Sequence, residues 1–241
     1  MIGTYASAAL ICAASLLVGR AVLSFAGGDG PRAWLAPAAG FGAILFVAGF
    51  LARAPGHATS AALGVVLLVV AAALVLWWRG ERPRWSRRGV VLALLVAAIL
   101  SIPFAIDGRW GLLGVGFNND LGLHLAWAEW LRSGLGPTPE AGYPLGPHAL
   151  AATVAGLPGI DLGQAFVGEI FAIGILTALT ALTVVGDLGR GRSLIAALLV
   201  AISYLGASYF AQGAFKETAE ALFVLAFALY LHDLDRRRGP K

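Results

Sequence analysis

The sequence predicts an all-α integral membrane protein with about seven transmembrane helices and interfacial helices in one large outer loop. Of its 241 residues, 59% are hydrophobic and only 12% are charged, and the mean hydropathy is +0.82. Soluble domains contain roughly 45–50% apolar and about 25% charged residues. The apolar residues also occur in runs that approach the roughly 20 residues a membrane-spanning helix needs. Both observations exclude an ordinary soluble domain.

The predicted spans are the apolar stretches that come close to this length. They cover residues 5–25, 34–51, 59–78, 89–106, 163–185, 193–210 and 219–231. In hydrocarbon, every backbone N–H and C=O must be paired within its own segment, so these stretches are expected to be helices. A weaker apolar stretch at 148–158 is too short to cross, and we interpret it as an interfacial or re-entrant helix.

Basic residues set the predicted orientation, because short loops rich in Lys and Arg stay on the cytoplasmic side. Arginines crowd the connection 79–88, the connection 186–192 and the tail 232–241. If these segments are inside, thirteen basic residues lie on the cytoplasmic side and four on the outer side. We therefore expect a multi-pass cell-membrane protein with a cytoplasmic C-terminus and the loop 107–161 on the outer face.

The chain divides into two predicted parts. Residues 1–88 form three N-terminal transmembrane helices, and residues 89–241 form a core portion with the outer loop 107–161 and the basic tail 232–241. The single cysteine, Cys12, lies in an apolar run, which excludes an intrachain disulfide and a cysteine-based metal site. The net charge of +4 comes from basic residues at the ends of apolar segments, so no nucleic-acid partner is expected.

The long outer loop carries the first candidate site. The run 117–132 predicts a capped amphipathic helix, because Asn and Asp favour the first turn. Asp120 and His124 are four residues apart and share a helix face, so the carboxylate can orient the imidazole or both can address one ligand. The alternative is that Asp120 only caps the helix and His124 is a solvated interfacial residue.

A turn rich in Pro and Gly follows this helix. The segment 134–139 breaks the helix, and the run from Tyr143 to His148, with sequence YPLGPH, predicts a rigid turn that opens the next apolar stretch. His148 therefore stands beside two prolines, in a position to meet the loop helix at the membrane surface.

A third candidate element lies between the last two spans on the predicted outer side. Lys216 is the only outer lysine, and such a cation can hold a phosphate as a point charge. Glu217 can tune that charge or reach a metal ion. The alternative is that Lys216 snorkels and Glu217 only starts a helix. Glu220, one turn inside the last span, requires a partner or a cavity because an ionisable group in lipid is costly.

The segments 117–120, 134–139 and 143–148 together resemble the first outer loop of GT-C type membrane glycosyltransferases. The resemblance implies that an acidic residue of this loop is the catalytic base or an acceptor ligand, and this position falls on Asp120. It also implies a sugar donor carried on a polyprenyl phosphate, with Lys216 as the phosphate contact.

The resemblance also suggests roles for the remaining candidate residues. His124 and His148 would orient the base, Arg132 would help to steady the leaving phosphate, and Tyr143 and Glu217 are further substrate-binding candidates. No metal ligand set and no cofactor is predicted, although a divalent metal is left open. The expected partners are the lipid-linked sugar donor and membrane lipid.

The resemblance covers about residue 89 to the C-terminus, and family members have more core spans than this portion offers. It therefore implies an amino-terminal portion of a longer enzyme, or a chain acting within a larger membrane complex. The predicted function is a membrane glycosyltransferase, or part of one, acting on the outer face.

Two other classes of function stay open. A polytopic transporter or permease would place broken or polar segments near the membrane midplane, whereas these spans are mostly uninterrupted. A noncatalytic membrane subunit or scaffold is favoured by small residues spaced four apart, such as Gly168 and Ala172, which suit close helix packing.

Overall fold

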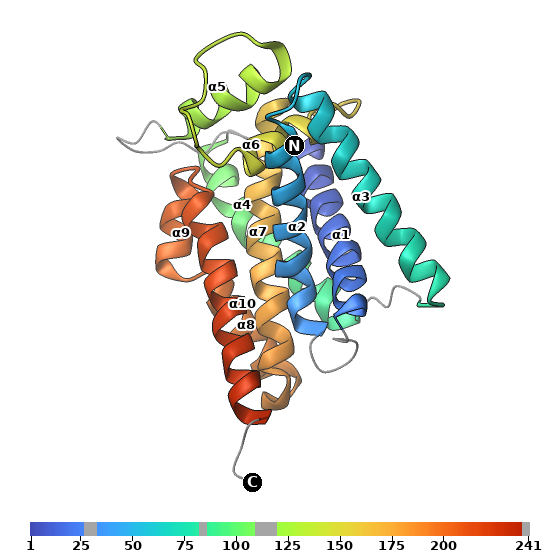
Figure 1. Ribbon diagram of the computed structural model, residues 1–241. Helices are drawn as coiled ribbons and strands as arrows, with labels where there is room; N and C mark the ends of the chain where they lie inside the picture. The colour runs from blue at the N-terminus through green and yellow to red at the C-terminus, as the bar shows by residue number, and fades with distance from the viewer. Residues whose placement is uncertain (27–32, 82–85, 109–119, 238–241) are drawn as a thin grey trace.

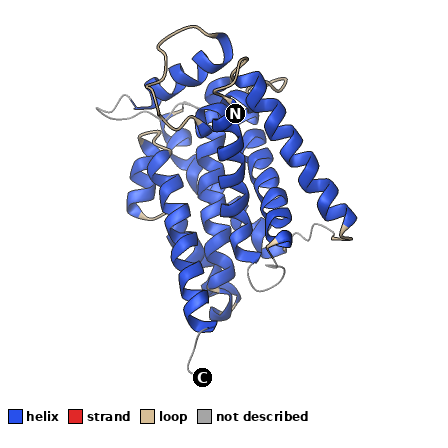
Figure 2. Cartoon of the chain, in the orientation of Figure 1, coloured by secondary structure: helices blue, strands red, loops and turns tan. Residues whose placement is uncertain are grey.

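The computed structural model describes residues 1–26, 33–81, 86–108 and 120–237, and these form a bundle of helices without strands (Figures 1 and 2). The helices are α1 (Ile2–Phe25), α2 (Ala36–Leu51), α3 (Ala58–Trp78), α4 (Arg87–Asp107), α5 (Asp120–Ser133), α6 (Gly146–Val154), α7 (Leu162–Val184), α8 (Arg190–Ala201), α9 (Tyr204–Ala211) and α10 (Lys216–Arg237). Two short 3-10 helices, η1 (Ala33–Leu35) and η2 (Gly186–Leu188), precede α2 and follow α7.

Among the described residues, five helical segments are long and apolar enough to cross a membrane: α1, η1 with α2, α3, α4 and α7. They cover the first five predicted spans. The sixth predicted span is two helices, α8 and α9, bent by 52°. Ser203 caps the second of them by accepting a hydrogen bond from the N–H of Gly206, which favours a new helix start at this point.

The seventh predicted span coincides with α10, which is long enough at 22 residues but is not among the helices apolar enough to cross a membrane. Acidic residues occur near both of its ends, at Glu217 and Glu220 and again at Asp233 and Asp235. The described residues therefore contain five apolar spans, or six if the bent pair is one span.

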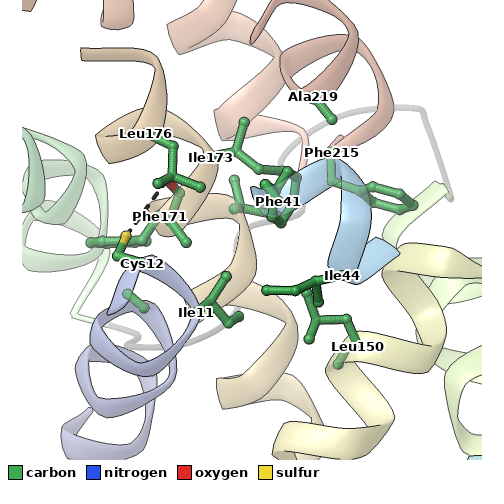
Figure 3. Close-up of a cluster of buried hydrophobic side chains, with 14 of the residues drawn as sticks. Ile11, Cys12, Phe41, Ile44, Leu150, Phe171, Ile173, Leu176, Phe215 and Ala219 are labelled. Carbon is green, nitrogen blue, oxygen red and sulfur yellow. Dashed lines mark hydrogen bonds between the residues drawn. The ribbon is translucent and has the colours of Figure 1, made fainter. Parts of the chain in front are cut away.

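The central helix is α7, which packs against α1, α4, α6 and α8. Figure 3 shows the core on two of its faces: Ile173 lies towards Phe41 and Phe215, while Phe171 and Leu176 lie towards Cys12. The Cys12 thiol donates a weak hydrogen bond to the carbonyl of Ala172 at 3.8 Å.

Small residues allow α1 to pack closely on two neighbours. A Cβ atom on Gly168 of α7 would overlap Ser7 and the Thr4 carbonyl, and a Cβ atom on Gly40 of α2 would overlap the Ser15 carbonyl. The close packing predicted from the spacing of Gly168 and Ala172 is confirmed, since both residues contact α1.

The helices α5 and α6 cover one end of the bundle, and α10 ends at the opposite end (Figure 1). With nine residues, α6 is too short to span a bilayer, as predicted for 148–158. It packs on α2, α3 and α7, and α5 lies on it. We call this the capped end of the bundle.

Candidate functional site

The helix α5 presents one face to the bundle, as the amphipathic pattern predicts. Its buried residues are Leu121, His124, Trp127, Ala128 and Leu131, which repeat every three or four positions. Asp120 is the first residue of α5, but its side chain lies outside the described residues, as do Asn118 and Asn119.

The start of α6 is fixed by a backbone contact with α2. A Cβ atom on Gly146 would come within 2.6 Å of the carbonyl oxygen of Leu45, and one on Gly49 would come within 2.8 Å of the Gly146 nitrogen. Only glycine allows this approach on both helices. The predicted rigid turn before His148 therefore closes against the end of α2.

The two loop histidines meet in the interior. The Nδ1 atom of His124 and the Nε2 atom of His148 are 2.9 Å apart, which is a hydrogen bond between two fully buried imidazoles. The predicted contact between His148 and the loop helix is confirmed. Aromatic rings of Trp127, Tyr143 and Phe215 surround the pair, with ring centroids 4.8–6.0 Å from that of His124.

This environment disfavours a charged imidazole. Burial lowers the pKa of His148 from 6.5 to about 3, and the positive charges of His124 and Lys216 act in the same direction. His148 is therefore neutral at pH 7. The pair shares one proton along its hydrogen bond, with one ring as donor and the other as acceptor.

Two proton arrangements fit this hydrogen bond. Either His148 donates from Nε2 to Nδ1 of His124, or His124 donates from Nδ1 to Nε2 of His148. When both rings are neutral, each arrangement places a second proton on a buried nitrogen, which is Nε2 of His124 in the first and Nδ1 of His148 in the second.

Two cations border this cluster at the first turn of α10 and the end of α2. The Lys216 ammonium lies 5.9 Å from the centre of the Tyr143 ring, a cation–π arrangement. The Arg53 guanidinium donates a hydrogen bond of 3.4 Å to the carbonyl of Tyr143. Both cationic side chains are exposed, so both can meet a ligand that approaches this surface.

A cavity of about 870 Å³ opens beside these cations, and we call it the lateral groove. Its polar end is formed by Arg53, Tyr143, Lys216 and Glu220. The rest of its wall is apolar and comes from α2 and α10, including the side chains of Phe46, Phe50, Phe223 and Phe227. Its base includes Phe215, whose ring also touches His124 and His148.

The structure thus brings together four of the candidate residues: His124, His148, Tyr143 and Lys216. Glu220 lines the lateral groove, so this ionisable residue of the last predicted span has the cavity that we expected it to need. The Oε2 atom of Glu217 is buried and has no hydrogen-bond partner in the part of the chain that the structure describes, and this residue does not line the lateral groove. Arg132 forms an exposed ion pair with Glu129 at 3.2 Å and is not part of the groove wall either.

Arg53 is a site residue that the sequence analysis counted only as a topological charge. In the sequence, Arg53 is distinguished only by its position directly after an apolar span on the predicted outer side. The pairing of α2 with α10 that makes the groove has no signal in a single sequence, because it joins segments about 170 residues apart.

Comparisons with protein-family models, curated proteins and solved structures found no match to this chain. Within the described part of the chain, no group of three or more His, Cys, Asp or Glu side chains is arranged to hold a metal ion.

Proposed function

We propose that this chain is a membrane glycosyltransferase, or part of one, that takes its sugar from a polyprenyl-phosphate carrier. The observation that supports this proposal is the lateral groove, which combines an apolar wall with two cations at one end. A lipid phosphate has the complementary shape: its hydrocarbon fits beside Phe46, Phe50 and Phe227, which are 63–73% exposed. Its phosphate fits beside Arg53 and Lys216.

In the proposed reaction, Asp120 accepts the proton of an acceptor hydroxyl while that oxygen attacks the anomeric carbon. The bond from this carbon to the phosphate oxygen breaks, and the polyprenyl phosphate leaves with the electron pair. Lys216 and Arg53 stabilise its negative charge. The His124–His148 pair holds the start of α5 against the end of the groove and orients the base.

The proposed membrane arrangement keeps seven crossings, with α8 and α9 as one bent span and α10 as the last. The capped end then faces outward and the C-terminus faces the cytoplasm. The arginine-rich connections at the opposite end support this orientation.

The first experiment tests donor binding by native mass spectrometry in mild detergent with added polyprenyl phosphate. We expect the wild type to retain this lipid, and expect the retained fraction to fall about fivefold for Lys216→Gln and for Arg53→Gln, since each surface cation contributes about 1 kcal/mol to lipid-headgroup binding. Asp120→Asn is expected to retain the lipid but to lose transfer of the sugar.

The matched controls are Arg190→Gln, which removes a cation at the opposite end, and Ala71→Trp, which adds a large side chain to the exposed face of α3. Both are expected to retain the lipid, whereas Ala219→Trp, inside the groove, is expected to lose it. Full sugar transfer by the Asp120→Asn protein would contradict the assignment of the base. Substrate flux into vesicles without a glycosylated product would favour a transporter, and retention by none of the proteins would favour a scaffold.

A further inference from the structure

A second cavity, of about 1020 Å³, lies on the other side of the bundle, and we call it the α1–α4 groove. Its walls are α1 and α4, and its floor is α7, against which both of these helices pack. Neither the candidate site nor the proposed reaction uses this groove. Its volume is at the upper end of the roughly 300–1,000 Å³ of sites for drug-sized ligands.

The α1–α4 groove is closed towards the capped end and polar at the other end. Towards the capped end, the Tyr5 hydroxyl and the Ser101 hydroxyl are 2.6 Å apart, which ties α1 to α4. At the opposite end, Arg20 and Glu81 form an ion pair of 3.4 Å. Between these two contacts, the walls are mainly Ala, Leu and Val, including Ala9, Ala13 and Ala93.

Arginines gather at the polar end. Besides Arg20, the exposed residues Arg87 and Arg88 stand in the sequence between two residues of the groove wall, Ser86 and Gly89. Arg79 donates a hydrogen bond of 2.7 Å to the carbonyl of Ser24, next to another wall residue, Leu23. Arg20, which is paired with Glu81, is the arginine that lines the groove, and Arg79 and Arg87 flank it at the same end. The charge at this mouth is complementary to an anion.

The charge at the mouth, rather than the length of the groove, favours one apolar occupant over another. The wall runs about 17 Å along α4, from Ser86 to Ala97, and about 27 Å along α1, from Tyr5 to Leu23, at 1.5 Å per residue. Either an acyl chain or a longer apolar segment fits this length. A phospholipid also brings a phosphate to the arginines at the mouth, which an apolar helix of a partner does not.

We propose that the α1–α4 groove is a binding site for an anionic glycerophospholipid. One acyl chain lies between α1 and α4 on the α7 floor, and the phosphate lies at Arg20, with Arg79 and Arg87 beside the headgroup. A guanidinium suits this role because it donates several hydrogen bonds to phosphate oxygens in one plane. The site is separate from the lateral groove and does not depend on the proposed transferase function.

The test is native mass spectrometry of the full chain released from nanodiscs that contain equal amounts of phosphatidylglycerol and phosphatidylcholine with the same acyl chains. We expect preferential retention of one phosphatidylglycerol molecule. Arg20→Gln is expected to reduce this retention about fivefold, the effect of one headgroup cation. Ala13→Phe, which fills the groove from an exposed position on α1, is expected to abolish it.

Three variants serve as controls. Arg190→Gln removes another arginine at the same end, and Ala71→Phe adds the same ring to the exposed face of α3; both are expected to keep the bound lipid. Lys216→Gln, in the lateral groove, is also expected to keep it, which separates the two cationic sites. Equal retention of the two phospholipids would overturn the proposal. So would undiminished retention by Ala13→Phe, or an equal loss in Arg20→Gln and Arg190→Gln.

Discussion

The imidazoles of His124 and His148 are joined by a hydrogen bond of 2.9 Å that links the loop helix α5 to the start of α6. The two residues are 24 positions apart in the chain, and both are buried. The bond therefore fixes the position of the loop helix α5 relative to α2 and α10, which form the lateral groove. The protonation state of the two imidazoles has measurable consequences.

We predict that His148 makes the stability of the protein depend on pH. Because burial lowers its pKa to about 3 from 6.5, the unfolded chain binds a proton below pH 6.5 while the folded chain does not until about pH 3. The free energy of unfolding therefore falls as the pH falls through this window, by up to about 1.4 kcal/mol per pH unit.

The measurement is the unfolding temperature in detergent at pH 7 and pH 5, followed by tryptophan fluorescence. His148→Phe keeps a ring in the aromatic cluster but removes the titrating group, so its shift between the two pH values is expected to be smaller than that of the wild type. Equal shifts in both proteins would show that His148 does not titrate in this way.

A second prediction concerns the proton within the histidine pair. Because His148 is neutral at pH 7, we expect its ring to carry one protonated and one unprotonated nitrogen. Nitrogen-15 NMR of histidine-labelled protein distinguishes protonated from unprotonated ring nitrogens. Assignment of the signals with His124→Gln and His148→Gln would show which ring donates, and two protonated nitrogens in His148 would contradict its neutral state.

The third prediction tests the backbone contact that fixes α6. In Gly146→Ala, the new Cβ would meet the carbonyl of Leu45 at 2.6 Å, so α6 must shift away from α2. We expect a loss of about 1–3 kcal/mol in stability, as for other overpacked sites. Gly122→Ala in α5 is the matched control, because its Cβ would meet nothing within 4 Å.

For Gly122→Ala, the better helix propensity of alanine is expected to raise stability by about 0.5–1 kcal/mol. Thermal unfolding of both variants in the same detergent gives the comparison. A Gly146→Ala protein as stable as Gly122→Ala would mean that the α2–α6 contact is looser than the backbone geometry indicates.

The sequence predicts the parts of this fold that depend on local composition. The helices α1, α3, α4 and α7 follow from long apolar runs, and α5 follows from its amphipathic repeat. The repeat did not decide whether His124 is buried or solvated, and the structure buries it. The break before α9 was not predicted, because an uninterrupted apolar run conceals a helix cap at Ser203. Hydropathy measures only how well a segment suits lipid, and a bend between two apolar helices hardly changes this value.

The candidate site is predictable only in part, for a related reason. Residue type and spacing drew attention to His124, His148 and Lys216, which the fold brings to one end of the bundle. The lateral groove arises from the pairing of α2 and α10, so the presence of Arg53 in it depends on tertiary packing. A single sequence shows the chemical type of a side chain but does not show which residues far away in the chain it contacts.

The last prediction concerns Glu169 on α7, which is 1% exposed and has no hydrogen-bond partner for either carboxyl oxygen among the described residues. Burying a polar group without partners is unfavourable, so a side chain of similar volume without these oxygens should suit the site better. We expect Glu169→Met to raise the free energy of unfolding by about 1–3 kcal/mol.

The matched control is Thr177→Val, also buried on α7, whose hydroxyl already donates to the carbonyl of Ile173 at 2.8 Å. Removing a satisfied hydroxyl should change stability little. The thermal stability of both variants is measured beside sugar transfer, since a buried carboxyl kept at a cost to stability is typical of a functional group. A gain in stability with loss of transfer in Glu169→Met would assign this carboxyl to the reaction, whereas a loss of stability would show that its oxygens have partners outside the described residues.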